Sequence, residues 1–132
     1  MDLAPATAMR LLELARRAQA KAHAPYSRFP VGAAVLAEDG RTFVGCNVEN
    51  SSFGLTICAE RNAVAAAVVA GARPIAVAVA GGQPELAPCG ACRQVLAEFC
   101  ADMPVVLASA GGYRIINLAE LLPGPFVFQG PS

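Results

Sequence analysis

The sequence predicts an α/β protein, a three-layer α-β-α sandwich with a mixed five-stranded sheet. Two observations lead to this fold class. Segments with strand character alternate with helical segments in the middle of the chain, and such alternation is typical of a sheet covered by helices on both faces. The chain also has 132 residues, of which 55% are hydrophobic and 15% charged, as expected for one folded domain over residues 1–132.

The N-terminal third is predicted to form a helix followed by a β-hairpin. Apolar residues recur at helical spacing from about residue 7 to 22, with Thr7 as the predicted N-cap and Pro25 beyond the end. Two apolar runs, 31–37 and 42–47, flank the turn residues Asp39-Gly40. An Asp-Gly pair between apolar runs favours a tight hairpin, so we expect both runs to be strands.

The rest of the chain is predicted to alternate between helices and strands. Residues 48–56 have a loop composition, and residues 58–70 form a helix that is apolar on nearly all sides beyond Asn62. Such a helix is usually buried on more than one side. The remaining elements are, in order, a strand 75–80, a loop 83–88, a helix 90–100, strands 105–108 and 113–116, and a short helix 118–122.

The composition narrows the functional classes. Ten acidic residues balance ten basic ones, which argues against a nucleic-acid polymer as partner, because proteins that bind such polymers are usually strongly basic. No apolar run approaches the ~20 residues of a membrane span, and no signal peptide is evident. We therefore expect a cytoplasmic protein without a membrane partner, whose five cysteines are reduced.

The cysteines provide the strongest functional signal. Pro88-Cys89-Gly90-Ala91-Cys92 contains a Cys-x-x-Cys at the start of a predicted helix. This motif alone leaves open a redox pair, half of a structural zinc site, or two buried thiols. Cys58 also lies at a predicted helix start, and one crossover could bring the two helix N-termini together. Three thiolates with a water in the fourth position form an open zinc site of the catalytic type.

Charged residues next to these cysteines complete a candidate site. Three thiolates outweigh Zn²⁺ by one negative charge, and Arg61 and Arg93 each directly follow a motif. We expect both arginines to donate hydrogen bonds to the thiolates, since such donors tune metal sites; the alternative for each is an exposed surface residue. Glu60 lies two residues after Cys58 and could transfer protons there, although a solvated glutamate at a helix N-terminus would also fit.

Three other residues that can bind metals are expected to lie outside the site. Cys46 falls on a predicted strand and Cys100 late on a predicted helix, where cysteines usually pack as small hydrophobic side chains. His23, the only histidine, lies at a helix end. A fourth ligand from among these residues would instead indicate a zinc-stabilised binding module without catalytic activity.

Cys58-Ala59-Glu60 together with Pro88-Cys89-Gly90-Ala91-Cys92 resembles the signature of zinc-dependent cytidine deaminases, in its all-cysteine variant. The chain is similar to the short homotetrameric type over almost its whole length. Further matching segments are 24–29, 31–34, 45–50 and 120–124. The resemblance implies hydrolytic deamination of cytidine and 2′-deoxycytidine to uridine and 2′-deoxyuridine, with release of ammonia, as in pyrimidine salvage. It also implies one Zn²⁺ per subunit and a homotetramer with active sites near subunit interfaces.

The resemblance further implies a role for each site residue. The zinc ligands would be Cys58, Cys89 and Cys92, and Glu60 would move protons between water, the ring N3 and the amino group. Asn47 and Glu49 would bind the ribose hydroxyls of the substrate. The aromatic ring of Phe29 would pack on the pyrimidine, and Ala59 N–H would donate to a pyrimidine oxygen. Phe126 would reach the active site of a neighbouring subunit. Alternation along a strand would send the side chains of Asn47 and Glu49 to one face.

Two features bear on the substrate. Phe53 stands where many relatives have tyrosine, so any polar contact of that hydroxyl to the sugar is absent. The segment Asn47-Val48-Glu49-Asn50 favours a nucleoside over blasticidin S, because the blasticidin S deaminases share the cysteine motifs but depart from this segment. A deaminase of that type, or one for another small aminopyrimidine, is the alternative. Deaminases of single-stranded nucleic acid are disfavoured by the neutral net charge.

Overall fold

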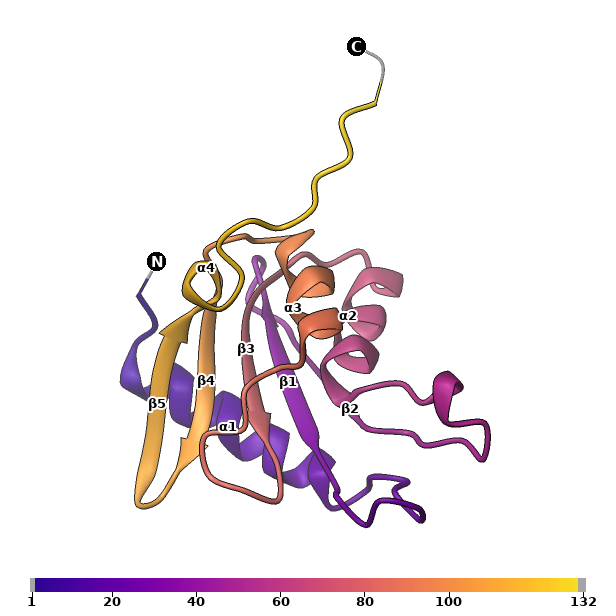
Figure 1. The fold of residues 1–132 in the computed structure, drawn as a ribbon. Helices are drawn as coiled ribbons and strands as arrows, with labels where there is room; N and C mark the ends of the chain where they lie inside the picture. The colour runs from indigo at the N-terminus through magenta and orange to yellow at the C-terminus, as the bar shows by residue number, and fades with distance from the viewer. Residues whose placement is uncertain (1, 131–132) are drawn as a thin grey trace.

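A mixed five-stranded sheet forms the centre of the computed structural model, which describes residues 2–130 (Figure 1). β3 and β4 pair in parallel, and the other neighbouring pairs are antiparallel. The hairpin predicted around Asp39-Gly40 joins β1 to β2. The strands, in the spatial order β2-β1-β3-β4-β5, are β1 Gly32–Ala37, β2 Thr42–Cys46, β3 Pro74–Ala80, β4 Pro104–Ser109 and β5 Gly112–Asn117.

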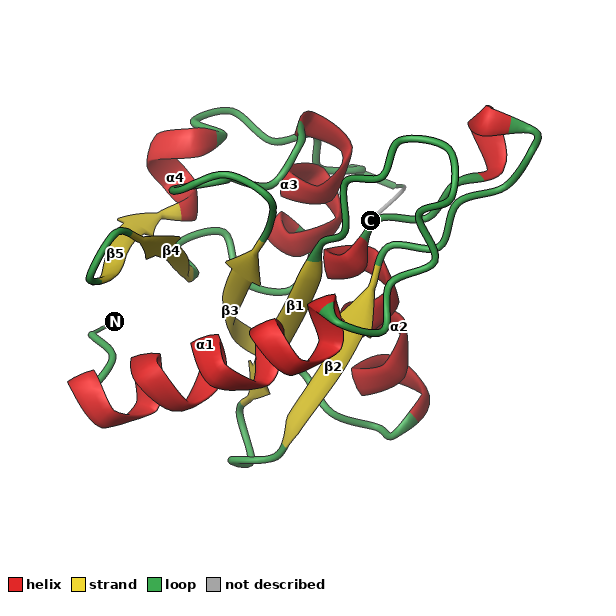
Figure 2. Cartoon of the chain, turned by 90° about the horizontal axis from the view of Figure 1, so that it is seen from below, coloured by secondary structure: helices red, strands yellow, loops and turns green. Residues whose placement is uncertain are grey.

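Helices cover both faces of this sheet (Figure 2), which confirms the predicted three-layer sandwich. α1 packs on one face, and α2 and α3 pack on the other. None of the helices in residues 2–130 has the length and apolar character needed to cross a membrane. The helices are α1 Pro5–Gln19, α2 Ala59–Val69, α3 Gly90–Ala97 and α4 Leu118–Leu121, with a 3₁₀ turn, η1, at Phe53–Leu55.

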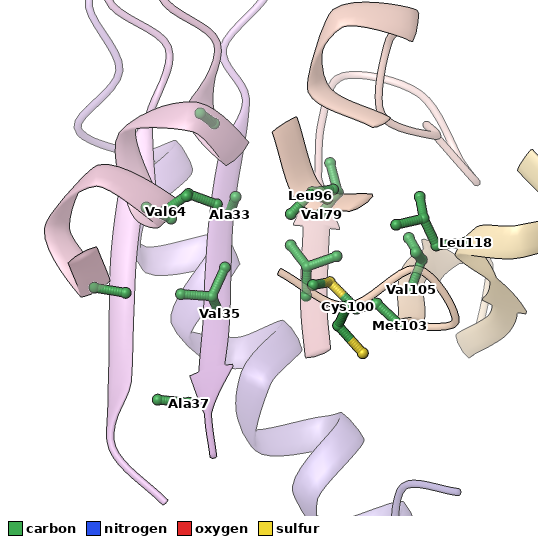
Figure 3. Packing of buried hydrophobic residues seen from close by; sticks show 14 of the residues in the cluster. Ala33, Val35, Ala37, Val64, Val79, Leu96, Cys100, Met103, Val105 and Leu118 are labelled. Carbon is green, nitrogen blue, oxygen red and sulfur yellow. The ribbon is translucent and has the colours of Figure 1, made fainter. Parts of the chain in front are cut away.

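Strand alternation decides which side chains enter which layer. In β1, Ala33 and Val35 belong to the core beneath α2 and α3, whereas Ala34 between them belongs to the core beneath α1. Figure 3 shows the core between the sheet and the helices α2 and α3, in which Leu96 of α3 lies over Val79 of β3. Because β1 and β3 are buried on both faces, their sequences are almost entirely apolar. This packing also holds α2 and α3 next to each other over one face of the sheet.

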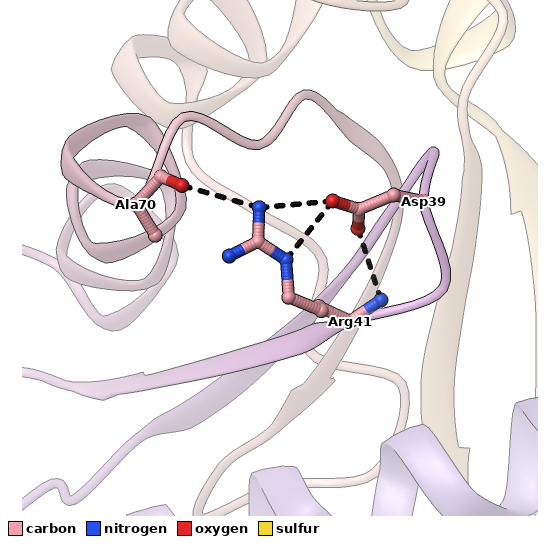
Figure 4. Close-up of polar contacts among 3 residues, drawn as sticks. All are labelled: Asp39, Arg41 and Ala70. Atoms are coloured by element: carbon pink, nitrogen blue, oxygen red, sulfur yellow. Dashed lines mark hydrogen bonds and ion pairs between the residues drawn. The ribbon is translucent and has the colours of Figure 1, made fainter.

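Arg41 ties the β1–β2 turn to the end of α2 (Figure 4). Asp39 Oδ1 accepts from Arg41 N at 3.1 Å, and Asp39 Oδ2 accepts from Arg41 Nε at 2.9 Å. These hydrogen bonds from Arg41 lower the pKa of Asp39. Arg41 Nη2 also donates to Ala70 O, 3.1 Å away. The turn therefore holds the C-terminal end of α2, at the end of the helix opposite to Cys58.

Some helix boundaries differ from the predictions. α1 begins at Pro5 with Ala4 as its N-cap, so the prediction of Thr7 as the cap is wrong. Proline suits the first helical position because its missing N–H needs no partner there. α1 also ends at Gln19, and α3 ends at Ala97. Both helices stop earlier than predicted because the chain tightens into turns beyond these residues.

One side of α2 is exposed within a single chain, although the sequence predicts a helix buried on more than one side. Ala63 and Ala67 are fully buried against the sheet, but Val68 and Val69 are 49% and 87% exposed. The apolar sequence of the helix had indicated neighbours all round. Within one chain the sheet and α3 cover part of α2, and its outer face is left apolar and accessible.

Candidate active site

Three thiols meet where α2 and α3 begin. Cys58 is the N-cap of α2, Cys89 is the N-cap of α3, and Cys92 lies in the first turn of α3. The sulfur of Cys89 lies 3.9 Å from that of Cys58 and 3.5 Å from that of Cys92, and all three sulfurs lie within 4.8 Å of one another. β3 connects the two helices along the chain, so the crossover brings both helix N-termini together as the sequence predicted.

The chemistry of this donor set fits a zinc ion. Three sulfur donors at mutual distances below 4.8 Å can share one metal, and zinc prefers thiolates in such numbers. A hydrogen bond with the Cys92 thiol lowers the pKa of Cys58 to about 5, with further help from Arg61 and against the effect of burial. The same hydrogen bond, together with burial, raises the pKa of Cys92. The hydrogen bonds within the set therefore favour the thiolate form of Cys58 before any metal contributes.

The other cysteines and the histidine do not join this cluster. The metal-binding group within the part of the chain that the structure describes contains neither Cys46, Cys100 nor His23. Cys46 Sγ donates to Lys21 O at 3.6 Å, and Cys100 Sγ lies 3.3 Å from Asp102 Oδ1. Within residues 2–130, therefore, Cys46, Cys100 and His23 lie outside the cluster of three thiols and do not supply a fourth ligand.

Arg61 contacts the cluster directly. Its Nη2 donates to Cys58 Sγ at 3.7 Å and to Thr56 O at 3.4 Å. The hydrogen bond to Cys58 raises the pKa of the guanidinium, so the cation is firmly retained beside the thiolate. This contact is the one that the sequence predicted for Arg61, and it offsets part of the negative charge of three sulfurs.

We expect Arg61→Ala to weaken zinc binding by ~10–100-fold, a typical effect of removing a hydrogen bond to a metal ligand. The reason is that Cys58 loses its cationic donor. Competition with a chromogenic chelator would measure the affinity. Arg114→Ala is the matched control, because that arginine is exposed and pairs with Glu85. Equal zinc affinity in the two variants would show that Arg61 has no influence on the metal.

Arg93 makes different contacts from those predicted. Its Nε donates to Pro88 O at 2.8 Å, and its Nη1 donates to Leu121 O at 2.9 Å. The prediction that Arg93 donates to a thiolate therefore does not match its hydrogen bonds in the structure. Since Arg93 lies one residue beyond Cys92, the helix directs it away from the sulfurs, toward the backbone just before Cys89. It joins the start of α3 to the end of α4.

Glu60 is buried beside the thiols. It occupies the first turn of α2 and is only 4% exposed. Burial is the main cause that raises the pKa of its carboxyl, and the negative charge of Cys58 adds to the effect. The alternative of a solvated glutamate is therefore wrong. A carboxyl with a raised pKa exchanges a proton near neutral pH more readily than an exposed one does, as a group that takes and returns a proton must.

A cavity of about 200 Å³ opens beside this carboxyl. It has an apolar wall with a few polar groups, as is typical of small-molecule sites. A larger cavity of about 330 Å³ lies between α1 and β2, but its wall includes none of the three clustered thiols and no carboxyl. The smaller cavity is therefore the candidate site, and its lining residues are Phe29, Val31, Asn47, Thr56, Cys58, Ala59, Glu60, Leu86, Ala87 and Cys89.

The two residues predicted to bind a sugar occupy different places. Asn47 is buried and lines the cavity, where its side chain accepts from Val31 N at 2.9 Å. Glu49 is not among the lining residues; its carboxylate accepts hydrogen bonds from Ser27 and Tyr26. The hydroxyl of Ser27 is the main cause that lowers the pKa of Glu49. Both residues lie beyond the end of β2, so strand alternation was the wrong argument for their placement.

The two remaining aromatic residues of interest lie on projecting segments. Phe126 is 72% exposed and belongs to the C-terminal tail, which extends away from the sheet in Figure 1. Its backbone N and O pair with the side chain of Gln94, at 3.0 and 2.9 Å. This anchor was missed from the sequence, because an amide at a half-buried helix position has no distinctive pattern. Phe53 is also 72% exposed, with its ring 5.6 Å from that of Tyr26.

Comparisons with known proteins agree on one family. Residues 5–108, which include both cysteine motifs, match the cytidine and deoxycytidylate deaminase zinc-binding region. A cytidine deaminase of Sporosarcina psychrophila is 48% identical over 121 residues, 89% of this chain and 89% of that protein. A cytidine deaminase of Mycobacterium tuberculosis H37Rv is 47% identical over 119 residues, 85% of this chain and 84% of that protein. The crystal structure of a Burkholderia pseudomallei cytidine deaminase is similar with a TM-score of 0.83 and 48% identity, over 89% of this chain and 97% of that one.

Proposed function

This chain belongs to the family of cytidine and deoxycytidylate deaminases, and we propose on that basis that it hydrolyses cytidine and 2′-deoxycytidine to the corresponding uridines and ammonia. The observation that carries this proposal is the buried carboxyl of Glu60 beside the three clustered thiols, of which Cys58 and Cys89 line the same cavity as Glu60. A metal site with an adjacent proton-transfer group is suited to adding water to a polar carbon.

Cys58, Cys89 and Cys92 would hold one Zn²⁺, whose Lewis acidity makes water a nucleophile near neutral pH. Glu60 takes a proton from the water that attacks C4 of the pyrimidine and delivers this proton to N3. It then transfers the proton of the new C4 hydroxyl to the amino group. The C4–N bond breaks, ammonia leaves, and a carbonyl remains at C4 with a proton on N3. Glu60 ends the cycle as it began, which is what a general acid–base catalyst requires.

Other residues of the chain would hold the substrate in place. Ala59 N–H, at the N-terminus of α2, would donate to a pyrimidine oxygen. Pro88 O has an acceptor position left besides its bond to Arg93, and it would accept from the substrate amine. The ring of Phe29 would pack on the base, and Asn47 and Glu49 would bind the ribose hydroxyls. The assignments of Ala59, Phe29 and Asn47 rest on the family resemblance and on their place in the cavity wall. The assignment of Glu49 rests on the resemblance alone, because Glu49 does not line the cavity.

The decisive experiment follows the ultraviolet absorbance of cytidine after addition of the protein. Cytidine and 2′-deoxycytidine are expected to lose absorbance, whereas cytosine and an oligonucleotide that contains cytidine are not. Turnover of blasticidin S alone would favour the alternative of an antibiotic deaminase. No turnover of any nucleoside by zinc-loaded protein would contradict the proposal.

We also propose that the chain is one catalytic domain that assembles into a cytoplasmic homotetramer. The outer face of α2, with Val68 and Val69 49% and 87% exposed, and the projecting aromatic Phe126 are apolar surfaces of the kind that subunits cover. In such an assembly the Phe126 ring would reach the active site of a neighbour, because Gln94 anchors the backbone of Phe126 while its ring is 72% exposed.

Val69→Asp is expected to break this tetramer, since a charge would be placed where apolar faces meet. Sedimentation velocity at micromolar concentration should give four times the 13.5 kDa of one chain for the natural protein and a smaller species for the variant. Met9→Asp is the matched control, because Met9 is 62% exposed on the opposite layer, in α1. A natural protein that sediments as a monomer would refute the tetramer.

A further inference from the structure

Phe29, in the wall of the cavity, is held at three points by Ser27, Asn47 and Gly82. Its backbone N–H donates to Ser27 Oγ at 3.0 Å. Its backbone O accepts from Asn47 Nδ2 at 2.9 Å. Its ring lies against Gly82, where an added Cβ would come within 3.0 Å of Cε1 and 3.2 Å of Cδ1. The ring therefore has little freedom to shift as long as these partners remain.

Ser27 connects this ring to Glu49. The Ser27 hydroxyl donates to Glu49 Oε2 while its oxygen accepts from Phe29 N. Glu49 Oε1 also accepts from Tyr26 N at 3.0 Å and Ser27 N at 3.2 Å. One carboxylate thus holds the whole turn before Phe29, and the hydroxyl hydrogen is committed to that carboxylate, which leaves the lone pairs of Ser27 for the N–H of Phe29.

This turn needs such support because its own backbone is unfavourable. Arg28, between Ser27 and Phe29, has a φ of 56°, a left-handed conformation that is costly for a residue other than glycine. Tyr26, Ser27 and Arg28 are exposed, so no hydrophobic core holds the turn in place. The hydrogen bonds to Glu49 and Asn47, together with the backbone hydrogen bond from Arg28 N to Ala24 O at 3.0 Å, therefore constrain where the Phe29 ring lies.

We propose that Ser27 is a positioning residue for the base site, which relays the fixed position of Glu49 to the ring of Phe29. This inference rests on the proposed function, because it assumes that the Phe29 ring packs on the pyrimidine. Under this proposal Glu49 helps to position the pyrimidine ring of the substrate, because it holds Ser27, which in turn holds Phe29. This effect is independent of any contact between Glu49 and the sugar. Ser27→Ala should then lower kcat/KM by roughly 3–10-fold, the effect of one neutral hydrogen bond.

The test compares Ser27→Ala with Ser27→Thr on two substrates, cytidine and 2′,3′-dideoxycytidine, which lacks the 2′ and 3′ hydroxyls of the sugar. Ser27→Ala should lose the same factor on both substrates, and Ser27→Thr, which keeps a hydroxyl, should recover most of it. In a Phe29→Ala background the loss should disappear, because the residue through which Ser27 acts is gone. If Phe29→Ala does not fold, Phe29→Leu replaces it, since leucine removes the aromatic ring and keeps an apolar side chain of similar volume at this position.

Two outcomes would overturn the relay. A loss seen only with cytidine would mean that Ser27 acts on the sugar through Glu49. A loss that persists unchanged without the Phe29 ring would mean that Ser27 acts elsewhere. Amide hydrogen exchange gives a readout without turnover: Phe29 N–H should exchange faster in Ser27→Ala than in the natural protein, and equal rates would also contradict the relay. Failure of the proposed function is separate, because the natural protein would then turn over neither substrate.

Discussion

Glu60→Gln is expected to lower kcat for cytidine by ~10²–10⁴-fold, the usual contribution of a general acid–base group. Glutamine has nearly the same shape, so it can fill the site in which Glu60 is only 4% exposed. An amide, however, cannot take a proton from water and return it to the base. Because the thiols are unchanged, the zinc content and the thermal unfolding temperature should stay close to those of the natural protein.

The measurement is the steady-state rate of protein whose zinc content has been determined by mass spectrometry. Glu120→Gln serves as the control, because Glu120 is exposed and lies in α4, outside the cavity wall. That variant should keep the full rate. If zinc-loaded Glu60→Gln turned over cytidine within ~10-fold of the natural rate, Glu60 would not be the proton-transfer group.

Cys89→Ser should remove most of the bound zinc and, with it, the activity. A serine hydroxyl is a far weaker zinc donor than a thiolate, and the two sulfurs that remain cannot complete the site. We expect the zinc affinity to fall by more than the ~10–100-fold that outer hydrogen-bond partners contribute. Cys89 is the best position for this test because it is exposed, whereas Cys92 is fully buried and its replacement would also disturb packing.

Zinc per chain after dialysis against a chelator is the quantity to measure, with circular dichroism as a check on folding. Cys46→Ser is the matched control: its sulfur donates to Lys21 O, a hydroxyl can do the same, and the residue lies outside the cluster. The control should keep its zinc. A Cys89→Ser protein that held zinc as well as the control would exclude Cys89 as a ligand.

The fold was largely predictable because its signals are local. An Asp-Gly turn between apolar runs identified the β1–β2 hairpin, and the alternation of helical and strand patterns identified the mixed sheet. Helix ends were less predictable, as at Pro5, where a proline at the first helical position was overlooked. The apolar pattern of α2 predicted neighbours for its outer face, and within one chain the structure leaves that face exposed.

The features of the candidate site also divide into those that the sequence predicted and those that it did not. The thiols of Cys58, Cys89 and Cys92 were predictable, since each motif sits at a helix start and the order of elements brings those starts together. The partners of Arg93 were not, because its contact with Leu121 O joins residues 28 positions apart in the sequence. Local spacing gives the direction of a side chain along its own helix, but not the backbone that it meets.

By itself, the sequence determined the chemistry of this protein: which residues can bind zinc, which carboxyl lies next to them, and which family they resemble. Only the tertiary structure decided the environments, namely that Glu60 is buried and that Glu49 holds the turn before Phe29 through Ser27. The physical reason is that residue type and helical or strand period are encoded locally. Burial and hydrogen bonding between distant segments, such as the 22 positions between Ser27 and Glu49, arise only when the layers pack.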